Sequence, residues 1–222
     1  MAAVYKINSL LVIAGLIILF DGNVYAEDWK VGEKWTYKHE GPRPFAGPSA
    51  MIKGDRTVEV TAIKGEGAEK RYLLKNMWGS EDPNPTTSYI DTKNMLHKLD
   101  IEDLFTLLIT PPVPAIWNLK PGEEKTLKAN MEVAEYSVPI EYVAKRMKDE
   151  TITVPAGEFK NCQHVQIISS LQNETGQTVK NKQEYWYHPK ARYLVKEVIV
   201  TNYQGDNNYT GTSVLKSHTK KD

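Results

Sequence analysis

Residues 195–215 read VKEVIVTNYQGDNNYTGTSVL, and this stretch indicates the fold class of the chain most directly. Two runs rich in β-branched and aromatic residues, Val195–Tyr203 and Tyr209–Leu215, flank the tetrapeptide Gly205-Asp206-Asn207-Asn208. Glycine, aspartate and asparagine tolerate the backbone angles that tight turns require. The stretch therefore predicts two antiparallel strands joined as a β-hairpin.

Strand-like runs and turn signals alternate along the rest of the chain in the same way. Apolar residues recur at every second position in Thr57–Ala62, Thr151–Val154 and His164–Ile168, a period typical of strands with one buried face. Pro155-Ala156-Gly157 follows one of these runs and has the composition of a type I turn. Glycine and proline separate the other runs, at residues 41–48, 79–85, 111–114 and 121–122. We therefore expect a single antiparallel all-β domain over residues 27–222.

One segment has two interpretations. Ile101–Ile109 follows Asp100, a residue type that caps helices, and carries Glu102 and Asp103 in what would be the first helical turn. The same short apolar run also fits a buried strand. We expect an all-β fold with at most one or two short helices, in which the sheet is curved or forms a half-barrel.

An internal repeat relates Trp29–Lys38 to Trp117–Lys128. From Gly32 and Gly122 onward, four of seven positions match at an offset of 90 residues. In each copy a tryptophan precedes a turn that leads into a strand. Either residues 27–115 and 116–222 are related halves of one curved sheet, or two turns share the residues that turns require.

Residues 1–26 have the features of a secretory leader. Lys6 supplies a positive charge, Leu10–Phe20 is an uninterrupted apolar or glycine stretch, and Val24-Tyr25-Ala26 suits a signal peptidase. An uncleaved membrane anchor is the alternative, but eleven helical residues span only about 16 Å, roughly half of a bilayer's hydrocarbon core. We predict cleavage after Ala26, a mature chain without a membrane span, and a periplasmic or secreted location.

The composition excludes several classes of protein. Lysine and arginine number 28, as do aspartate and glutamate, so the formal net charge of the 222 residues is zero. This balance argues against nucleic acid as a partner. A single cysteine, Cys162, excludes an intramolecular disulfide, an iron–sulfur cluster and a thiolate zinc finger.

Catalytic and metal-binding motifs are largely missing. The chain has no Gly-x-Ser-x-Gly sequence, and its five histidines lack the spacing of metal-ligand pairs. Cys162 and His164 share a strand face, which suits either a nucleophilic pair or a buried thiol beside a ring. The many acidic residues leave a glycan hydrolase with paired carboxylates open. We predict no metal, no cofactor and no catalytic residues.

Aromatic residues are the positive functional signal. The chain has five tryptophans and twelve tyrosines but only four phenylalanines. Tryptophan and tyrosine have one polar end and suit a cleft or a sheet rim, although β-sheets favour aromatic residues in any case. In a strand, Trp186 would face one way and its two neighbouring tyrosines the other. The predicted ligand-binding residues are Trp35, Tyr37, Tyr185, Trp186 and Tyr187.

Three segments together resemble a known group of proteins. Trp29–Tyr37 is similar to a "VG-x-x-W-x-Y" opening, Thr153–Cys162 to a "VPAG-x-F" hairpin, and Tyr185–Pro189 with Val195–Glu197 to a "YWY-x-P…V-K" strand pair. These motifs resemble exported bacterial β-proteins of unknown function, including the TapB-like group. The resemblance implies a secreted curved sheet, akin to periplasmic lipoprotein carriers, and implies no activity. Members of the group have glycine in the turn after "YWY-x-P", whereas Lys190-Ala191-Arg192 lacks one.

These observations favour a non-enzymatic binding module of the periplasm or medium. Its curved, aromatic-rich sheet would hold an apolar small molecule, a lipid, or a segment of an envelope protein. One alternative is a hydrolase that acts on envelope glycans or esters. Another is a structural or assembly protein that adds an exposed sheet edge to a partner.

Overall fold

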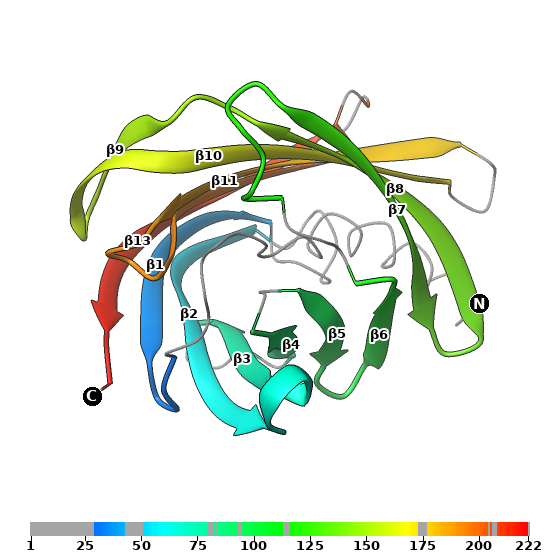
Figure 1. Ribbon diagram of the computed structural model, residues 1–222, viewed down its shortest axis with the longest axis horizontal. Coiled ribbons are helices and arrows are strands. Elements are labelled where there is room, and N and C mark those ends of the chain that lie inside the picture. The colour runs from blue at the N-terminus through cyan, green and yellow to red at the C-terminus, as the bar shows by residue number, and fades with distance from the viewer. Residues whose placement is uncertain are drawn as a thin grey trace.

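The computed structural model describes residues 29–42, 51–79, 82, 84–92, 95–112, 116–172, 177–203, 205 and 208–221. The predicted leader, residues 1–26, lies outside this part of the chain. The described residues form one antiparallel sheet that closes on itself (Figure 1). Its strands are β1 (Lys34–Pro42), β2 (Met51–Lys64), β3 (Arg71–Trp78), β4 (Thr86–Asp91), β5 (Leu96–Ile101), β6 (Phe105–Thr110), β7 (Glu124–Val133), β8 (Tyr136–Arg146), β9 (Glu150–Val154), β10 (Gly157–Gln172), β11 (Thr178–His188), β12 (Tyr193–Thr201) and β13 (Tyr209–Thr219).

Closure makes the fold a twelve-stranded barrel rather than the expected half-barrel. Around the ring, β1 to β8 follow one another in chain order, then come β10 to β13, and β13 pairs again with β1. The ring therefore takes six strands from residues 27–115 and six from residues 116–222, whose duplication stays a prediction. The thirteenth strand, β9, lies outside the ring and pairs only with β10. Local sequence patterns carry no information about the β1–β13 pairing, which joins the two ends of the chain.

The helical interpretation of Ile101–Ile109 is wrong. β5 ends at Ile101, a turn with a left-handed Asp103 follows, and β6 begins at Phe105. The sequence of a short apolar run does not distinguish a helix from a strand. Here the pairing with neighbouring strands determines the structure. The helices of the described ranges are limited to a single 3-10 turn, Gly67–Glu69. No helix within those ranges is long and apolar enough to cross a membrane.

Both predicted hairpins are present. β12 and β13 are antiparallel neighbours, with Thr201 opposite Tyr209. Val154 lies opposite Gly157, so Pro155-Ala156 forms the connection between β9 and β10. The local residue patterns were therefore sufficient to predict these two strand pairs.

The two copies of the sequence repeat form the same turn. Gly32 and Gly122 both have positive φ, 86° and 88°, and both donate 2.7 Å backbone hydrogen bonds, to Val60 and Arg146 respectively. In each copy the next residue is a glutamate whose carboxylate accepts from the backbone N–H three residues earlier. Each turn leads into a strand, and Trp29 and Trp117 are buried beside them. The predicted turns are confirmed.

β8 and β9 follow one another along the same edge of the long strand β10. β8 pairs with β10 from Arg146 opposite Val165 to Glu141 opposite Ser170. Beyond that point β8 is paired only with β7. The barrel wall therefore has a seam between β8 and β10, which is hydrogen-bonded from Arg146 to Glu141 and unpaired beyond Glu141.

Pro139 explains where the seam opens. The backbone N–H and C=O of Arg146 bond to Glu123 and Gly122, which precede β7, whereas Met147 donates its N–H to His164 of β10. Because the direction of the backbone groups alternates along a strand, the odd-numbered residues of β8 bond to β10 and the even-numbered ones to β7. In this register Pro139 would lie opposite Gln172 as the next hydrogen-bonded pair. Proline has no N–H to donate, so the ladder stops at Glu141.

Restoring a donor at position 139 should extend the seam. We expect Pro139→Thr to protect the new amide from hydrogen exchange and to raise the unfolding free energy by about 0.5–1.5 kcal/mol, the worth of one hydrogen bond. Ser137→Thr, at a position that already has an N–H, is the matched control and should change neither quantity. An unprotected amide at residue 139 together with unchanged stability would contradict this explanation.

Candidate functional site

The five predicted ligand-binding residues are all buried, and they do not form one surface. Their exposed fractions range from 0% for Trp35 to 6% for Tyr187. Trp35, Tyr37, Tyr185 and Tyr187 occupy inward-facing positions, whereas Trp186 faces the other side of β11. Their role in binding stays a prediction, and for the four inward-facing residues it requires a ligand that enters the barrel.

Trp35 and Tyr37 belong to an aromatic cluster at one end of the barrel. The ring of Trp35 stacks on Tyr193 at 4.8 Å between centroids and meets Trp29 edge-on at 5.5 Å. Such pairs stabilise by about 0.5–1.5 kcal/mol each beyond the burial of their surface. We call this group the aromatic cluster; its members are Trp29, Trp35, Tyr37, Tyr72 and Tyr193.

The polar ends of the cluster hold the turn between β11 and β12. Trp35 Nε1 donates to Ala191 O at 2.7 Å, Trp29 Nε1 to Arg192 O at 3.2 Å, and Tyr37 Oη to Leu194 O at 2.9 Å. The tryptophan and tyrosine ends that the sequence suggested for a ligand therefore bind backbone carbonyls. In this region the aromatic excess has a structural use.

Arg192 has a left-handed backbone in the turn Lys190-Ala191-Arg192, which contains no glycine. Its φ is 57°, in the left-handed region that costs a non-glycine residue roughly 1–2 kcal/mol. The Arg192 guanidinium bonds both oxygens of Glu33, at 2.8 and 3.4 Å. This pairing stabilises the turn in the conformation that glycine would adopt without strain.

Glu33 is fully buried and links three parts of the chain. Its carboxylate accepts hydrogen bonds from Arg192 before β12 and, at 2.9 Å, from His218 in β13. The backbone N–H of Lys30 is a further donor. Burial alone would raise the pKa of Glu33, but the bonds from His218 and Arg192 lower it below its ordinary value of 4.5.

A buried ion pair lies inside the barrel. Arg56 of β2 pairs with Glu197 of β12, and the two side chains are only 5% and 3% exposed. The guanidinium also donates to Asn76 at 3.0 Å and to Ser213 at 3.3 Å, and it lies 4.7 Å from the ring centre of Trp78. A buried charge is tolerated only when its partner and hydrogen bonds compensate its lost hydration, as here.

The interior also contains a serine–histidine contact, which bears on the hydrolase alternative. His39 Nδ1 lies 3.0 Å from Ser213 Oγ, and both side chains are buried. Burial and the charge of Arg56 lower the pKa of His39 to about 4, so the ring is neutral at pH 7. Its Nε2 has no partner within the described ranges, so no carboxylate orients the ring as a base. The contact lacks the third member of a catalytic triad.

Ser213 also begins a Ser-x-x-Lys sequence with Lys216, a pattern found in some hydrolases. Here it lies in a strand, where residues three apart face opposite sides. Ser213 is buried in the barrel, while Lys216 pairs with Asp55 at 2.7 Å on the surface. The two residues therefore cannot act together.

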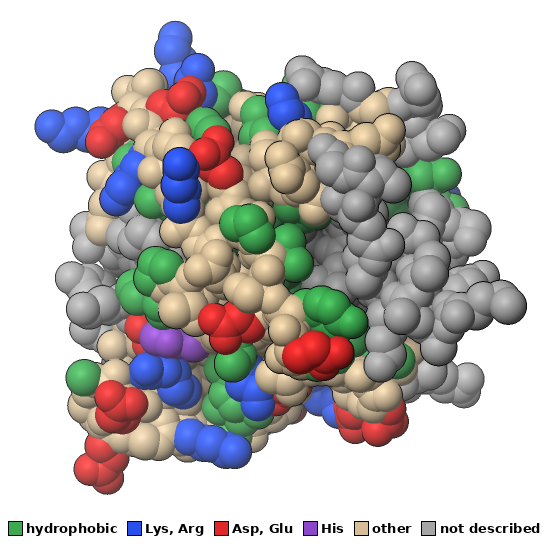
Figure 2. Space-filling model, turned by 90° about the vertical axis from the view of Figure 1, so that its right-hand side faces the viewer, with side chains coloured by type: hydrophobic (Ala, Val, Ile, Leu, Met, Phe, Trp, Pro, Cys, Tyr) green, Lys and Arg blue, Asp and Glu red, His purple; other side chains and the backbone are tan. Residues whose placement is uncertain are grey.

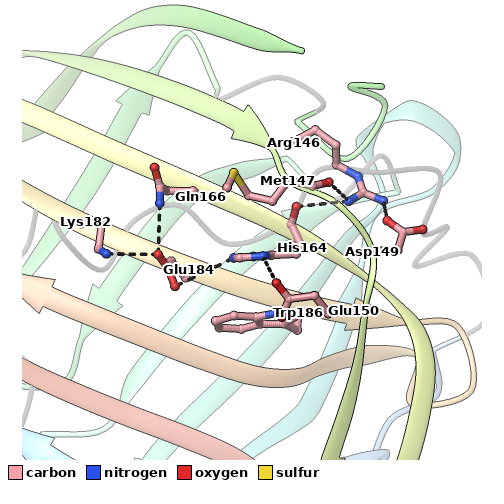
Figure 3. Close-up of polar contacts among 9 residues, drawn as sticks. All are labelled: Arg146, Met147, Asp149, Glu150, His164, Gln166, Lys182, Glu184 and Trp186. Carbon is pink, nitrogen blue, oxygen red and sulfur yellow. Dashed lines mark hydrogen bonds and ion pairs between the residues drawn. The ribbon is translucent and has the colours of Figure 1, made fainter. Parts of the chain in front are cut away.

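The outward-facing Trp186 is part of a second cluster at the break between β8 and β9 (Figure 3). His164 of β10 stacks on Trp186 at 4.3 Å, and Lys196 lies 4.4 Å from the centre of the same indole ring. Glu150 of β9 accepts a hydrogen bond from Trp186 Nε1 at 3.0 Å and contacts His164 Nδ1 at 3.1 Å. These contacts link β9 to β10 and β11. Trp186 is covered on both faces and has no free ring surface for a ligand.

Cys162 and His164 have different hydrogen-bond partners. The Cys162 thiol donates to Phe159 O at 3.3 Å, while His164 contacts Glu150. Burial raises the pKa of Cys162 to about 11, so the thiol is protonated at neutral pH. A thiolate nucleophile requires the opposite shift. The structure therefore favours the buried-thiol interpretation of this pair.

A cleft of about 750 Å³ lies at the open end of the seam between β8 and β10. Lys128 and Glu141 form an ion pair of 3.8 Å at its rim. Figure 2 faces the side on which the β7–β8 hairpin ends, and it shows exposed hydrophobic side chains among charges of both signs. The apolar residues that line the cleft are Pro111, Ala129, Val138, Pro139, Ile140 and Leu171.

The lining residues come from both faces of the sheet. Ala129, Ile140 and Leu171 are buried inward-facing positions, whereas Pro139 lies in an outward-facing one. The cleft is therefore lined by residues of both faces where β8 and β10 are no longer paired. Among the residues placed by the structure, no three histidine, cysteine or acidic side chains are arranged to hold a metal ion.

The fold resembles that of a solved exported protein. A presumed exported protein with a YmcC-like fold from Bacteroides fragilis matches with a TM-score of 0.54 and 12% identity, over 92% of this chain and 100% of that one. The fold is therefore YmcC-like. A presumed lipoprotein from Parabacteroides distasonis matches with a TM-score of 0.45 and 12% identity, over 86% of this chain and 96% of that one. The hypothetical lipoprotein YmcC from Escherichia coli matches with a TM-score of 0.46 and 13% identity, over 83% and 84%.

No family model and no curated protein matches the chain. The likeness in structure agrees with the expectation of an exported bacterial β-protein fold of unknown function. The narrower TapB-like grouping stays a prediction.

The polar residues that matter most in this structure are not apparent from the sequence. Arg56 and Glu197 are 141 residues apart, so no spacing connects them. Pro139 was detectable, since a proline within a strand-like run signals an edge or an interrupted ladder. The cleft itself depends on strands that meet only in the closed barrel.

Two substitutions of Arg192 separate its backbone strain from its ion pair. Arg192→Ala and Arg192→Gly both remove the bonds to Glu33, but only glycine removes the cost of the left-handed conformation. We expect both variants to unfold more easily than the wild type, with Gly more stable than Ala by about 1 kcal/mol. Urea unfolding measures this difference. Equal unfolding midpoints for the two variants would show that the left-handed backbone at residue 192 is not strained.

The lowered pKa of Glu33 predicts a loss of stability in acid. A carboxylate with a lowered native pKa stabilises the fold above about pH 4.5, and this contribution falls as pH drops through the native value. Glu33→Gln should therefore cost about 1–3 kcal/mol at pH 7, and the difference from wild type should shrink below pH 4.5. Glu40→Gln, at an exposed ion pair with Lys53, is the control and should cost little at either pH. A pH-independent cost for Glu33→Gln would refute this assignment.

Proposed function

We propose that this protein is an exported, non-enzymatic binding module of the bacterial cell envelope, and that the cleft at the seam holds the apolar part of its ligand. The observation that carries the proposal is the cleft itself. Its volume of about 750 Å³ lies in the range of small-molecule sites, roughly 300–1,000 Å³. Apolar surface buried there would contribute about 25 cal/mol per Å².

Three observations support a location in the envelope. Residues 1–26 have the pattern of a cleavable secretory leader. The solved protein from Bacteroides fragilis with the same overall fold is described as exported. The motifs shared with the TapB-like group point in the same direction.

The geometry gives less support to the two alternatives. The buried His39–Ser213 contact lacks an orienting carboxylate, which weakens the hydrolase. An assembly protein would offer an open strand edge to a partner, and at the β8 edge Pro139 removes a donor that such pairing would use. Proline at an edge is a device that discourages strand addition.

Native mass spectrometry of the mature protein, exported by its own leader and purified without detergent, tests the proposal. We expect a bound apolar molecule whose mass disappears after extraction with organic solvent. Ser137→Trp, at an exposed position that lines the cleft, should lose this molecule. Ser217→Trp, at an exposed position of β13 away from the cleft, should retain it. An unliganded wild-type mass under gentle conditions would overturn the proposal.

A further inference from the structure

Two of the buried tyrosine hydroxyls without a hydrogen-bond partner are those of Tyr142 and Tyr185. Tyr142 of β8 and Tyr185 of β11 are 0% and 1% exposed. Their Oη atoms are fully buried and have no hydrogen-bond partner among the residues that the structure describes. Leaving a buried hydroxyl unpaired costs roughly 1–3 kcal/mol, and phenylalanine would fill the same space without that cost. Burial raises the pKa of both groups, so each keeps its proton and can donate.

Tyr142 is the inward-facing residue of β8 that follows the lining of the cleft. Ile140 lines the cleft, and Tyr142 is the next inward-facing residue of β8, about 7 Å further along the strand. On β10, Ser169 is opposite Tyr142, and Leu171, which also lines the cleft, is two residues further along. A ligand whose apolar part occupies the cleft would therefore present its other end to Tyr142.

The charges of the interior define what that other end can be. Besides burial, the pKa of Tyr185 responds to the charges of Glu197 and Arg56 and to Tyr142, so the Tyr185 hydroxyl is within electrostatic reach of the buried ion pair. Arg56 and Glu197 compensate each other. A further charge would have no partner among them and would lose its hydration, at a cost of several kcal/mol. A hydroxyl or amide group can accept from and donate to tyrosine without that penalty.

We propose that the ligand is an amphiphile with an uncharged, hydroxyl-bearing head group, which Tyr142 and Tyr185 bind inside the barrel while its apolar chain lies in the seam cleft. This inference rests on the proposed function and specifies its ligand class. It assigns the two tyrosines as head-group ligands and the cleft as the site of the chain.

A pair of probes with the same acyl chain tests the head group. 1-Decanoylglycerol has an uncharged head with two hydroxyls, and decanoate has a charged carboxylate. We expect the mature protein to bind decanoylglycerol at least tenfold more tightly than decanoate, measured by calorimetry at pH 7 below the micelle concentration. Tyr142→Phe and Tyr185→Phe should each weaken the binding of decanoylglycerol at least fivefold and leave decanoate unaffected.

Tyr72→Phe is the matched control. Tyr72 is also fully buried with an unpartnered hydroxyl, but it lies in the aromatic cluster. This variant should bind both probes as the wild type does. Thermal unfolding without ligand checks that Tyr142→Phe and Tyr185→Phe are folded, since removal of an unpaired hydroxyl should not lower the melting temperature.

The outcomes separate the two proposals. If neither probe binds, the cleft holds no apolar chain and both proposals fail. If the two probes bind equally, or if the phenylalanine variants bind decanoylglycerol like the wild type, the head-group assignment fails while the cleft remains a binding site. Weaker binding by Tyr72→Phe as well would also overturn the assignment, because the effect would then not depend on proximity to the cleft.

Discussion

Closure of the sheet is the constraint on which the rest of this structure depends, and Glu33 lies where the chain ends meet. β1 and β13 pair over most of their length, which joins residues more than 170 positions apart. The buried Glu33 carboxylate precedes β1, accepts from His218 of β13 and pairs with Arg192 before β12. One side chain therefore fixes three strand ends in register. Because burial of an unpaired carboxylate is costly, Arg192 and His218 must both be present.

A ring of twelve strands also determines what its interior must contain. Eight-stranded barrels are just wide enough for side chains to fill, so a wider ring needs large ones. This chain uses tyrosine and tryptophan, whose polar ends then require partners. At one end the aromatic cluster bonds to carbonyls of the β11–β12 turn. Further inside, Arg56 and Glu197 form a charged centre with Asn76 and Ser213. The aromatic excess is thus first a consequence of barrel width.

How much could be predicted from the sequence depends on the range of the interaction. Turn chemistry at Pro155-Ala156 and at residues 205–208 is local, and both hairpins are confirmed. The repeated Gly-Glu turns are local as well. For Ile101–Ile109 the local signal is ambiguous, and pairing with β4 and β7 decides the outcome. Closure, the Arg56–Glu197 pair and the cleft depend on residues far apart in the sequence. No local pattern in the sequence indicates that such residues are in contact.

A closed antiparallel ladder is continuous, so an opening through its wall exists only where the ladder is interrupted. In this barrel the interruption follows from one missing N–H, that of Pro139, at the position where β8 would continue to pair with Gln172. Had proline been placed at an even-numbered position of β8, it would have broken the pairing with β7 instead. Because Pro139 is at an odd-numbered position, the hydrogen bonds between β7 and β8 are intact and only the pairing of β8 with β10 is interrupted. The same residue that limits strand addition thereby leaves the β8 edge unpaired with β10 where the cleft lies.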